Sequence, residues 1–218
     1  MSNWCATNFI LKGNKTDIDR FCKTVNDCRN KPDIAVNEWG KLWLGNLCVA
    51  FGYTYEPDNI ELRGTIDTNP ETIACFFLQE NETDTLEALE CNDGTWTIYF
   101  STITAWTRSK WFHKMLEEKF PNVTVAFKST DEFGNFFHCH LPEMFNLPKY
   151  VLQLTDQEDV EAKEGEEKKI ATVLNDYTGL SFTEDDIRIM DDNFYKTLQD
   201  YNDTHEDHEV YIYQWKEI

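Results

Sequence analysis

The chain has 218 residues, of which 41% are hydrophobic and 14% aromatic, so it can bury a core and does not have the composition of a disordered protein. It carries 40 acidic and 20 basic residues, and the resulting formal net charge of −20 opposes nonspecific binding to nucleic acid or to an anionic membrane. No apolar run approaches the roughly 20 residues that a membrane-spanning helix needs.

The first thirty residues predict a strand followed by a helix. Between Cys5 and Lys12 the side chains alternate in the way that is typical of a strand, and Gly13-Asn14 provides a turn. Thr16 is the expected N-cap of the helix, with Asp19 as its capping-box partner. The apolar residues expected on the buried face of this helix, which should end near residue 29, are Ile18, Phe21, Cys22, Val25 and Cys28.

Two more strands are predicted in the next forty residues. Apolar side chains occupy odd positions in residues 42–53, and residues 60–66 show the same period after a turn at 56–59. The odd-numbered apolar stripe consists of Trp43, Leu47, Val49, Phe51 and Tyr53. Residues 70–91 are harder to assign: residues 71–80 fit a buried strand or a short helix, and residues 83–91 favour a helix without a strong apolar face.

Residues 96–128 show the clearest pattern, which is strand, helix, strand. The period of two from residue 96 to 100 gives way to helical spacing and then returns between Val123 and Lys128. The helical positions are Phe112, Met115, Leu116 and Phe120. Pro121 ends the helix because proline has no N–H to donate.

The C-terminal third predicts a further α/β segment. A turn at 131–134 leads into a strand around residues 137–141, and residues 148–155 form a possible further strand. The charge-dense residues 156–169 are either a linker or the exposed start of a helix. A helix capped at Thr183 and a final strand at 210–215 follow. We therefore expect an α+β fold with one domain at 1–155 and an acidic helical extension at 156–218, which ends in a strand and either forms a separate lobe or packs on the same domain.

Two stretches of the chain resemble the YubB/Api92-like proteins of bacteria, plasmids and phages. The first is Asn3-Trp4-Cys5 before the first strand; the second runs from Thr104-Ala105-Trp106 through the helix to Phe120-Pro121 and the strand after it. The resemblance implies a ferredoxin-like antiparallel sheet with helices packed on one face. It implies no activity and no catalytic residues. The chain departs from the family pattern at Arg108 and Ser109, where that family usually has prolines.

His138 and His140 form the strongest candidate for a metal site. They flank Cys139 in a predicted strand, where alternate residues share a face, so both imidazoles could bind one zinc ion. Two ligands do not make a site, and two exposed histidines on the outside of a sheet are the simpler interpretation. Asp203 and the run from His205 to His208 could likewise hold a divalent metal or form an ordinary loop.

The seven cysteines include no CxxC pair, and the N-terminus lacks the basic and apolar regions of a signal peptide, so we expect reduced thiols and a cytoplasmic protein. Cys5 could serve as a nucleophile only with a neighbouring base and a lowered pKa, and no family signature surrounds it. A packed strand residue is the simpler interpretation.

Two classes of function remain open. The first is a non-enzymatic interaction protein, of a kind that a mobile element could carry, whose acidic residues at 156–169 and 183–207 bind a partner protein with a basic surface. In its sharper form this protein is an inhibitor of a nucleic-acid-binding or defence protein. The second is an enzyme, or a small-molecule or metal binder, with a pocket beside the sheet. No cofactor motif is present, and the sequence indicates neither the oligomeric state nor the partner's identity.

Overall fold

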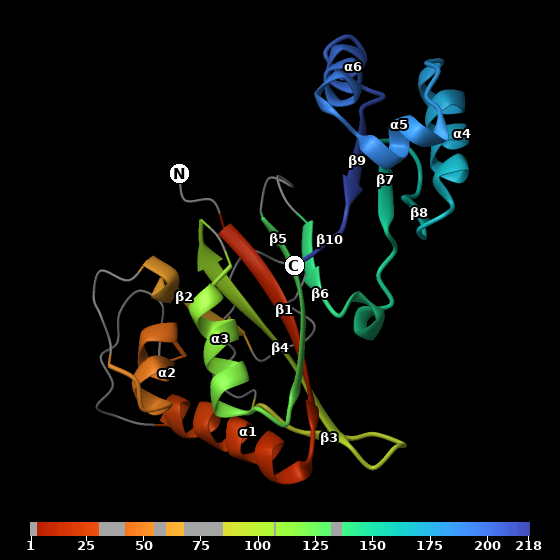
Figure 1. Ribbon diagram of the computed structural model, residues 1–218. Coiled ribbons are helices and arrows are strands. Elements are labelled where there is room, and N and C mark those ends of the chain that lie inside the picture. The colour runs from red at the N-terminus through yellow and green to blue at the C-terminus, as the bar shows by residue number, and fades with distance from the viewer. Residues whose placement is uncertain (1–3, 31–41, 55–59, 68–84, 107, 132–136) are drawn as a thin grey trace. The chain divides into compact units, whose positions relative to one another are not determined.

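The computed structural model describes residues 4–30, 42–54, 60–67, 85–106, 108–131 and 137–218 (Figure 1). Contacts divide the chain into two compact units. Unit 1 comprises residues 1–145 with 217–218, and unit 2 comprises residues 146–216. None of the helices in the described ranges is long and apolar enough to cross a membrane.

Unit 1 has the predicted ferredoxin-like topology. Its elements follow the order β1 (Trp4–Gly13), α1 (Lys15–Asn30), β2 (Gly64–Asp67), β4 (Trp96–Ala105), α3 (Lys110–Lys119) and β5 (Thr124–Asp131). The four strands lie side by side in the order β5-β1-β4-β2, with every pair antiparallel. This arrangement is a split βαβ sheet, so the α+β fold class is confirmed.

Short strands extend this sheet. On the β5 side, β6 (Phe137–His140) pairs with β5, and β10 (Lys216–Glu217) pairs with β6. At the other side β3 (Leu89–Glu90) pairs with β4. The chain therefore leaves unit 1 after a 3-10 turn at Pro142–Phe145, builds unit 2, and returns to the edge of the first sheet.

One face of the sheet and three helices enclose the core of unit 1. Phe9 lies opposite Phe100 on β4 and Phe127 on β5, and the Phe9 and Phe100 rings stack with centroids 5.2 Å apart. Helices α1 and α3 add Phe21 and Phe112 to this row. The aromatic residues of the predicted strands and helices thus meet in a single hydrophobic cluster, which holds the helices on one face.

The predicted strand at residues 42–53 is wrong, because the chain forms helix α2 (Leu44–Ala50) there. Leu44, Leu47 and Phe51 lie at helical spacing and are buried, whereas Val49, part of the odd-numbered stripe, is 59% exposed. Trp43 precedes the helix, and its indole Nε1 donates to the Leu62 carbonyl at 2.7 Å. The strand predicted at 60–66 is shorter, because a 3-10 turn (Ile60–Leu62) precedes β2.

Two predicted helix boundaries also differ. Helix α1 begins at Lys15, and its first turn is capped by Asn14, whose Oδ1 accepts from the Asp17 N–H at 2.9 Å; the predicted cap, Thr16, lies inside the helix. The helix predicted from Thr183 is two helices, α5 (Glu184–Ile189) and α6 (Asp192–Asn202), because Met190 adopts a φ of 40° between them. The capping role of Thr183 is confirmed.

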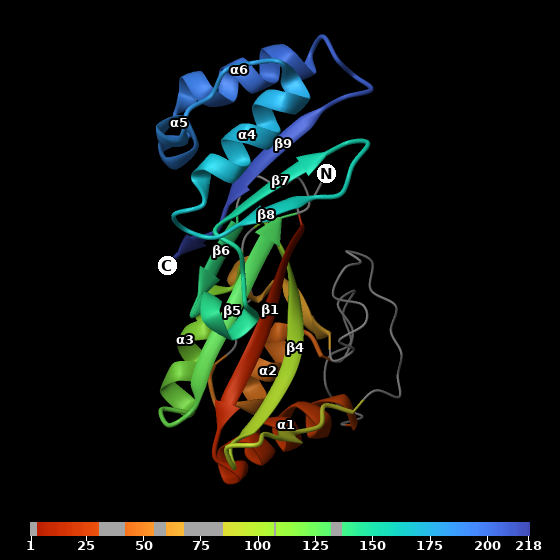
Figure 2. The ribbon, with the colours of Figure 1, turned by 90° about the vertical axis from the view of Figure 1, so that its right-hand side faces the viewer.

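Unit 2 is a three-stranded antiparallel sheet with helices on one face (Figure 2). Its order is β7 (Tyr150–Leu154), β8 (Val160–Ala162), α4 (Glu167–Thr178), α5, α6 and β9 (Val210–Gln214), and β7 is the central strand. The inward side chains of the strands and the apolar faces of the helices form a second hydrophobic cluster. Every member of this cluster lies between residues 150 and 212.

The boundary between the units differs from the one expected at 155/156. The strand at 150–154 was assigned to the first domain, but it pairs with β8 and β9 and so belongs to unit 2. The charged residues 156–169, expected to be a linker or the start of a helix, contain β8, the turns around it and, from Glu167, the start of α4. Most of the turn predicted at 131–134 and most of the stretch at 70–91 lie outside the described residues. The helical preference predicted for residues 83–91 is wrong in the described part, because residues 85–88 form no helix and Leu89–Glu90 form β3.

Candidate functional sites

The two histidines of the predicted metal site share one face of β6. His138 is paired with Ser129 and His140 with Phe127, so both imidazoles belong to the side of the sheet that carries the helices. Among the described residues no group of three or more His, Cys, Asp or Glu is arranged to hold a metal ion. The same search covers His205 and His208. A metal at His138 and His140 stays a prediction.

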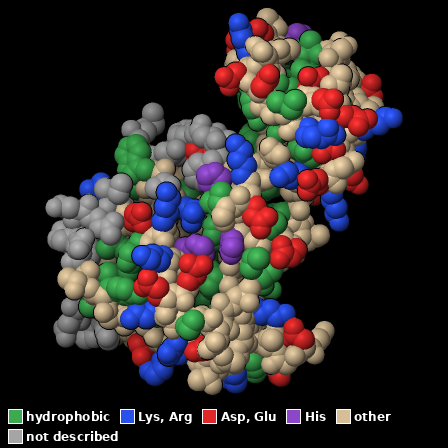
Figure 3. All heavy atoms as spheres, viewed as in Figure 1, with side chains coloured by type: hydrophobic (Ala, Val, Ile, Leu, Met, Phe, Trp, Pro, Cys, Tyr) green, Lys and Arg blue, Asp and Glu red, His purple; other side chains and the backbone are tan. Residues whose placement is uncertain are grey.

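His140 lies beside a second histidine that the sequence analysis did not single out. The ring centroids of His140 and His113 are 5.6 Å apart, and both rings contact Phe127, at 4.9 Å for His113 and 5.8 Å for His140. The His140 Nδ1 atom lies 3.2 Å from the main-chain oxygen of Ile218, which β10 brings to this edge. Histidine and Lys/Arg side chains gather between α3 and β6 on the face shown in Figure 3.

Arg108 completes this group. Its guanidinium carbon lies 4.7 Å from the centroid of the Phe127 ring, and burial lowers the pKa of the half-buried guanidinium. No hydrogen bond or ion pair joins Arg108 to the described residues. Burial also lowers the pKa of His113, and the nearby Arg108 and His140 lower it further, whereas Glu117 acts in the opposite direction. We call Arg108, His113 and His140 the basic cluster.

Toward the start of β1, the helix-facing side of the sheet changes from apolar to polar. The row formed by Phe9, Phe100 and Phe127 is followed by a row of three buried hydroxyl groups, on Thr7, Thr102 and Ser129. The next row contains Cys5, Thr104 and the buried carboxyl of Asp131. The alternating pattern placed Cys5 and Thr7 on one side, but only the pairing of three distant strands shows that the polar groups meet.

Cys5 is the centre of these polar rows and is fully buried. Its Sγ lies 3.2 Å from the Ser129 hydroxyl, which in turn is 2.8 Å from the Thr7 hydroxyl. Burial raises the pKa of the Cys5 thiol, and the Asp131 carboxylate raises it further, although the hydroxyl contacts act against both. A buried thiol with a raised pKa is a poor nucleophile, so these residues describe a packed polar layer rather than a catalytic site.

Unit 2 is the more acidic part of the chain. Residues 146–216 contain 18 acidic and 7 basic residues, a formal net charge of −11, and this range is described in full. All the acidic side chains except those of Glu167 and Glu209 are exposed. Within 146–216 only two ion pairs form, Arg188 with Asp185 at 2.6 Å and His208 with Asp156 at 3.4 Å. Most of these carboxylates therefore have no cationic partner within the unit.

Two acidic turns that are far apart in the sequence meet at one end of the unit 2 sheet. Leu154 pairs with Val210, and the Thr155 N–H and hydroxyl both donate to the Glu209 carbonyl, at 3.2 and 2.9 Å. The turn after β7 therefore lies beside the segment before β9. We call this surface the acidic end; its residues are Asp156, Glu158, Asp159, Glu206, Asp207 and Glu209. The other acids of unit 2 belong to β8, to its helices and to the turns between them.

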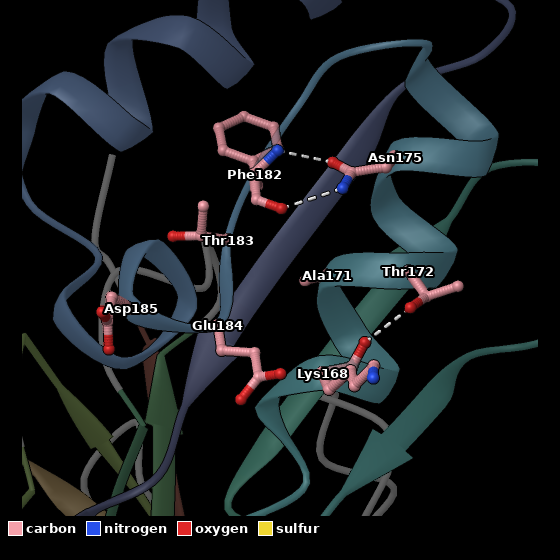
Figure 4. Close-up of a pocket in the computed structure, with 8 residues that line it drawn as sticks. All are labelled: Lys168, Ala171, Thr172, Asn175, Phe182, Thr183, Glu184 and Asp185. Atoms are coloured by element: carbon pink, nitrogen blue, oxygen red, sulfur yellow. Dashed lines mark hydrogen bonds between the residues drawn. The ribbon is translucent and has the colours of Figure 1, made fainter.

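Unit 2 also has an open groove of about 450 Å³ between α4 and the start of α5 (Figure 4). The Asn175 amide in this groove donates to the Phe182 carbonyl at 2.9 Å and accepts from the Phe182 N–H at 2.7 Å. The charged groups of the lining are Lys168, Glu184 and Asp185. Ligand pockets are mostly apolar, and this lining is not, so it does not indicate a particular ligand.

Comparisons of the chain with protein-family models, with curated proteins and with solved structures found no match. The resemblance to YubB/Api92-like proteins therefore stays a prediction, and the candidate sites stand on their own geometry.

Proposed function

We propose that this protein is a non-enzymatic binding protein that recognises a partner protein with a basic surface through the acidic end of unit 2. The observation that carries the proposal is the convergence of the 156–159 and 206–209 turns at one end of a small sheet. Neither turn alone would present more than three carboxylates. A cytoplasmic location is part of the proposal, because the cysteines in the described ranges are free thiols.

Electrostatics would give such a surface specificity and a fast association rate. Opposite charges steer two proteins together, and the effect falls as salt shortens the Debye length to about 8 Å at physiological ionic strength. The other exposed carboxylates of unit 2 add to this field. The acidic end is the place where two acidic turns from distant parts of the sequence lie side by side.

The test compares two variants of the full chain in a pull-down from lysate of the native host. Glu158→Gln, Glu206→Gln and Asp207→Asn remove three charges of the acidic end whose side chains make no hydrogen bond within the described residues. We expect this triple variant to retain about tenfold less partner, because each exposed charge pair contributes roughly 0.2–1 kcal/mol. Retention by the wild-type chain should also fall as salt rises.

The matched control changes the net charge by the same amount elsewhere. Glu90→Gln, Glu164→Gln and Glu184→Gln affect exposed side chains outside the acidic end. This control should retain the partner as the wild-type chain does. Equal loss in both variants would show that only net charge matters, and binding that resists high salt would contradict the proposal.

A further inference from the structure

The basic cluster of unit 1 is a group of cationic side chains in a protein whose net charge is negative. The chain has two acidic residues for each basic one, yet Arg108, His113 and His140 surround a single ring, Phe127, without a carboxylate among them. Glu117 Oε1 lies 3.7 Å from the His113 Nε2, which is beyond hydrogen-bond distance but within the range of an ion pair. The side chain of Glu117 is 57% exposed. Glu117 can therefore pair with His113 when that imidazole is protonated, whereas Arg108 and His140 have no Asp or Glu partner among the described residues.

We propose that unit 1 binds a small oxyanion of the phosphate type between the Arg108 guanidinium and the imidazoles of His113 and His140. A guanidinium offers a planar fork of N–H donors that matches the oxygens of a phosphate group. This site is separate from the acidic end, so the proposal goes beyond the proposed function.

The three side chains have donors available for such a ligand. Arg108 makes no hydrogen bond to the described residues, and the His113 Nε2 is buried without a hydrogen-bond partner. His140 contacts the Ile218 main-chain oxygen through Nδ1, so that nitrogen carries the proton and Nε2 is directed elsewhere. When His113 and His140 are protonated, each Nε2 carries a hydrogen and can donate it to an oxygen of the oxyanion.

The same neighbours favour an anion over a metal cation. The Arg108 charge acts on His113 and lowers its pKa, so it would also repel a cation bound between the rings. The charged groups around the cluster are Arg108, Glu117 and Glu61, and Glu61 already accepts a hydrogen bond from the Trp111 N–H at the start of α3. A bound oxyanion would stabilise the protonated imidazoles, so its affinity should be higher at pH 6 than at pH 8.

The experiment is a titration of the full chain with inorganic phosphate, followed by the NMR signals of the histidine rings. We expect saturable shifts of the His113 and His140 signals at millimolar phosphate. Arg108→Gln should weaken binding at least about tenfold, because the charge-assisted hydrogen bonds of the fork are lost. Arg188→Gln is the matched control: Arg188 pairs with Asp185 in unit 2, and its loss should leave the phosphate affinity unchanged.

Further arms separate the alternatives. His140→Gln should weaken binding even if Arg108→Gln disturbs the packing on Phe127, since His140 lies on a different element. Tighter binding of adenosine monophosphate than of inorganic phosphate would identify a phosphate monoester as the ligand, and equal binding would identify the free ion. The proposal would be overturned if phosphate caused no shift, if both arginine variants bound equally, or if zinc alone shifted the two histidine signals.

Discussion

Burial makes the Cys5 thiol unreactive, although a cysteine at this position in the sequence could have been a nucleophile. In the sequence it is a thiol near the start of a strand; in the fold it lies in a layer of hydroxyl groups and is inaccessible to solvent. Cys22 is also buried, and burial raises the pKa of its thiol to about 11. Because the thiolate is the reactive species, both residues should be inert at neutral pH.

We therefore predict that iodoacetamide at pH 7.5 labels Cys91 well before Cys5 or Cys22. Cys91 is partly exposed, whereas the other two are buried with raised pKa values. Mass spectrometry of the labelled peptides over time would measure the order. Labelling in urea should remove the difference and serves as the control, while fast labelling of Cys5 in the folded protein would favour a nucleophile.

The residues of the candidate sites could be predicted only in part from the sequence. His138 and His140 share a face, as alternation requires, but their neighbours come from other elements. Arg108 and His113 precede or lie within α3, and only the packing of that helix over β5 brings them to Phe127. Sequence spacing describes neighbours along one element and carries no information on which elements meet.

At the scale of elements, three asparagine side chains act as connectors. Each binds both the N–H and the carbonyl of one distant residue: Asn26 binds Leu86, Asn175 binds Phe182, and Asn202 binds Val210. A side-chain amide that donates and accepts at once satisfies the two backbone groups in the way that a neighbouring strand would. In this way two loops, at Leu86 and Phe182, and the start of β9 at Val210 are held to the helices.

Asn202→Ala should destabilise unit 2 by about 2–3 kcal/mol, because two hydrogen bonds are lost at a buried position. Asn193→Ala on the exposed side of the same helix should change stability by less than about 0.5 kcal/mol. Hydrogen exchange of the β7 and β9 amides measures the stability change in each variant, because these amides report on the unfolding of unit 2 alone. Equal protection in the two variants would mean that water replaces the Asn202 bonds.

Long periodic elements were predictable and short ones were not. Residues 96–128 fold as strand, helix and strand, as predicted. Each of these elements is long enough for its apolar side chains to repeat several times, which makes the period clear in the sequence. Helix α2 has only seven residues, and Leu47 fits both a period of two and a helical face there. The buried set of Leu44, Leu47, Cys48 and Phe51 decides in favour of the helix, because these residues pack against α1 and β2.

At the scale of the whole molecule, the chain consists of two units with separate cores. The cluster of unit 1 contains residues between 9 and 127, and the cluster of unit 2 contains residues between 150 and 212. The charge is also divided unevenly, since unit 2 carries more than half of the net charge in about a third of the residues. The two units should therefore fold, and bind, independently.

Replacing residues 147–215 by a short Gly/Ser linker should leave unit 1 folded. The strands to be joined are neighbours, because β10 pairs with β6 and the Ile218 N–H donates to the Cys139 carbonyl at 2.9 Å. Near-UV circular dichroism and urea unfolding would measure the result, since six of the seven tryptophans lie outside the excised segment. A product without cooperative unfolding would show that unit 1 depends on unit 2.

This excised protein also separates the two proposals. It should lose the partner that the acidic end retains and should still bind phosphate at the basic cluster. The same excision with residues 216–218 also removed is the control for β10, and it should show weaker phosphate binding because the contact between His140 and Ile218 is lost.

Because β10 comes from the end of the chain, β6 has to wait for its partner strand during synthesis. About 75 residues separate the end of β6 from the start of β10, so at roughly 5–20 residues per second the ribosome needs about 4–15 s to make them. Throughout that interval β6 is an unpaired edge strand that could associate with another nascent chain. All the strands and helices of unit 2 leave the ribosome first, and the last strand of unit 1 then closes this edge.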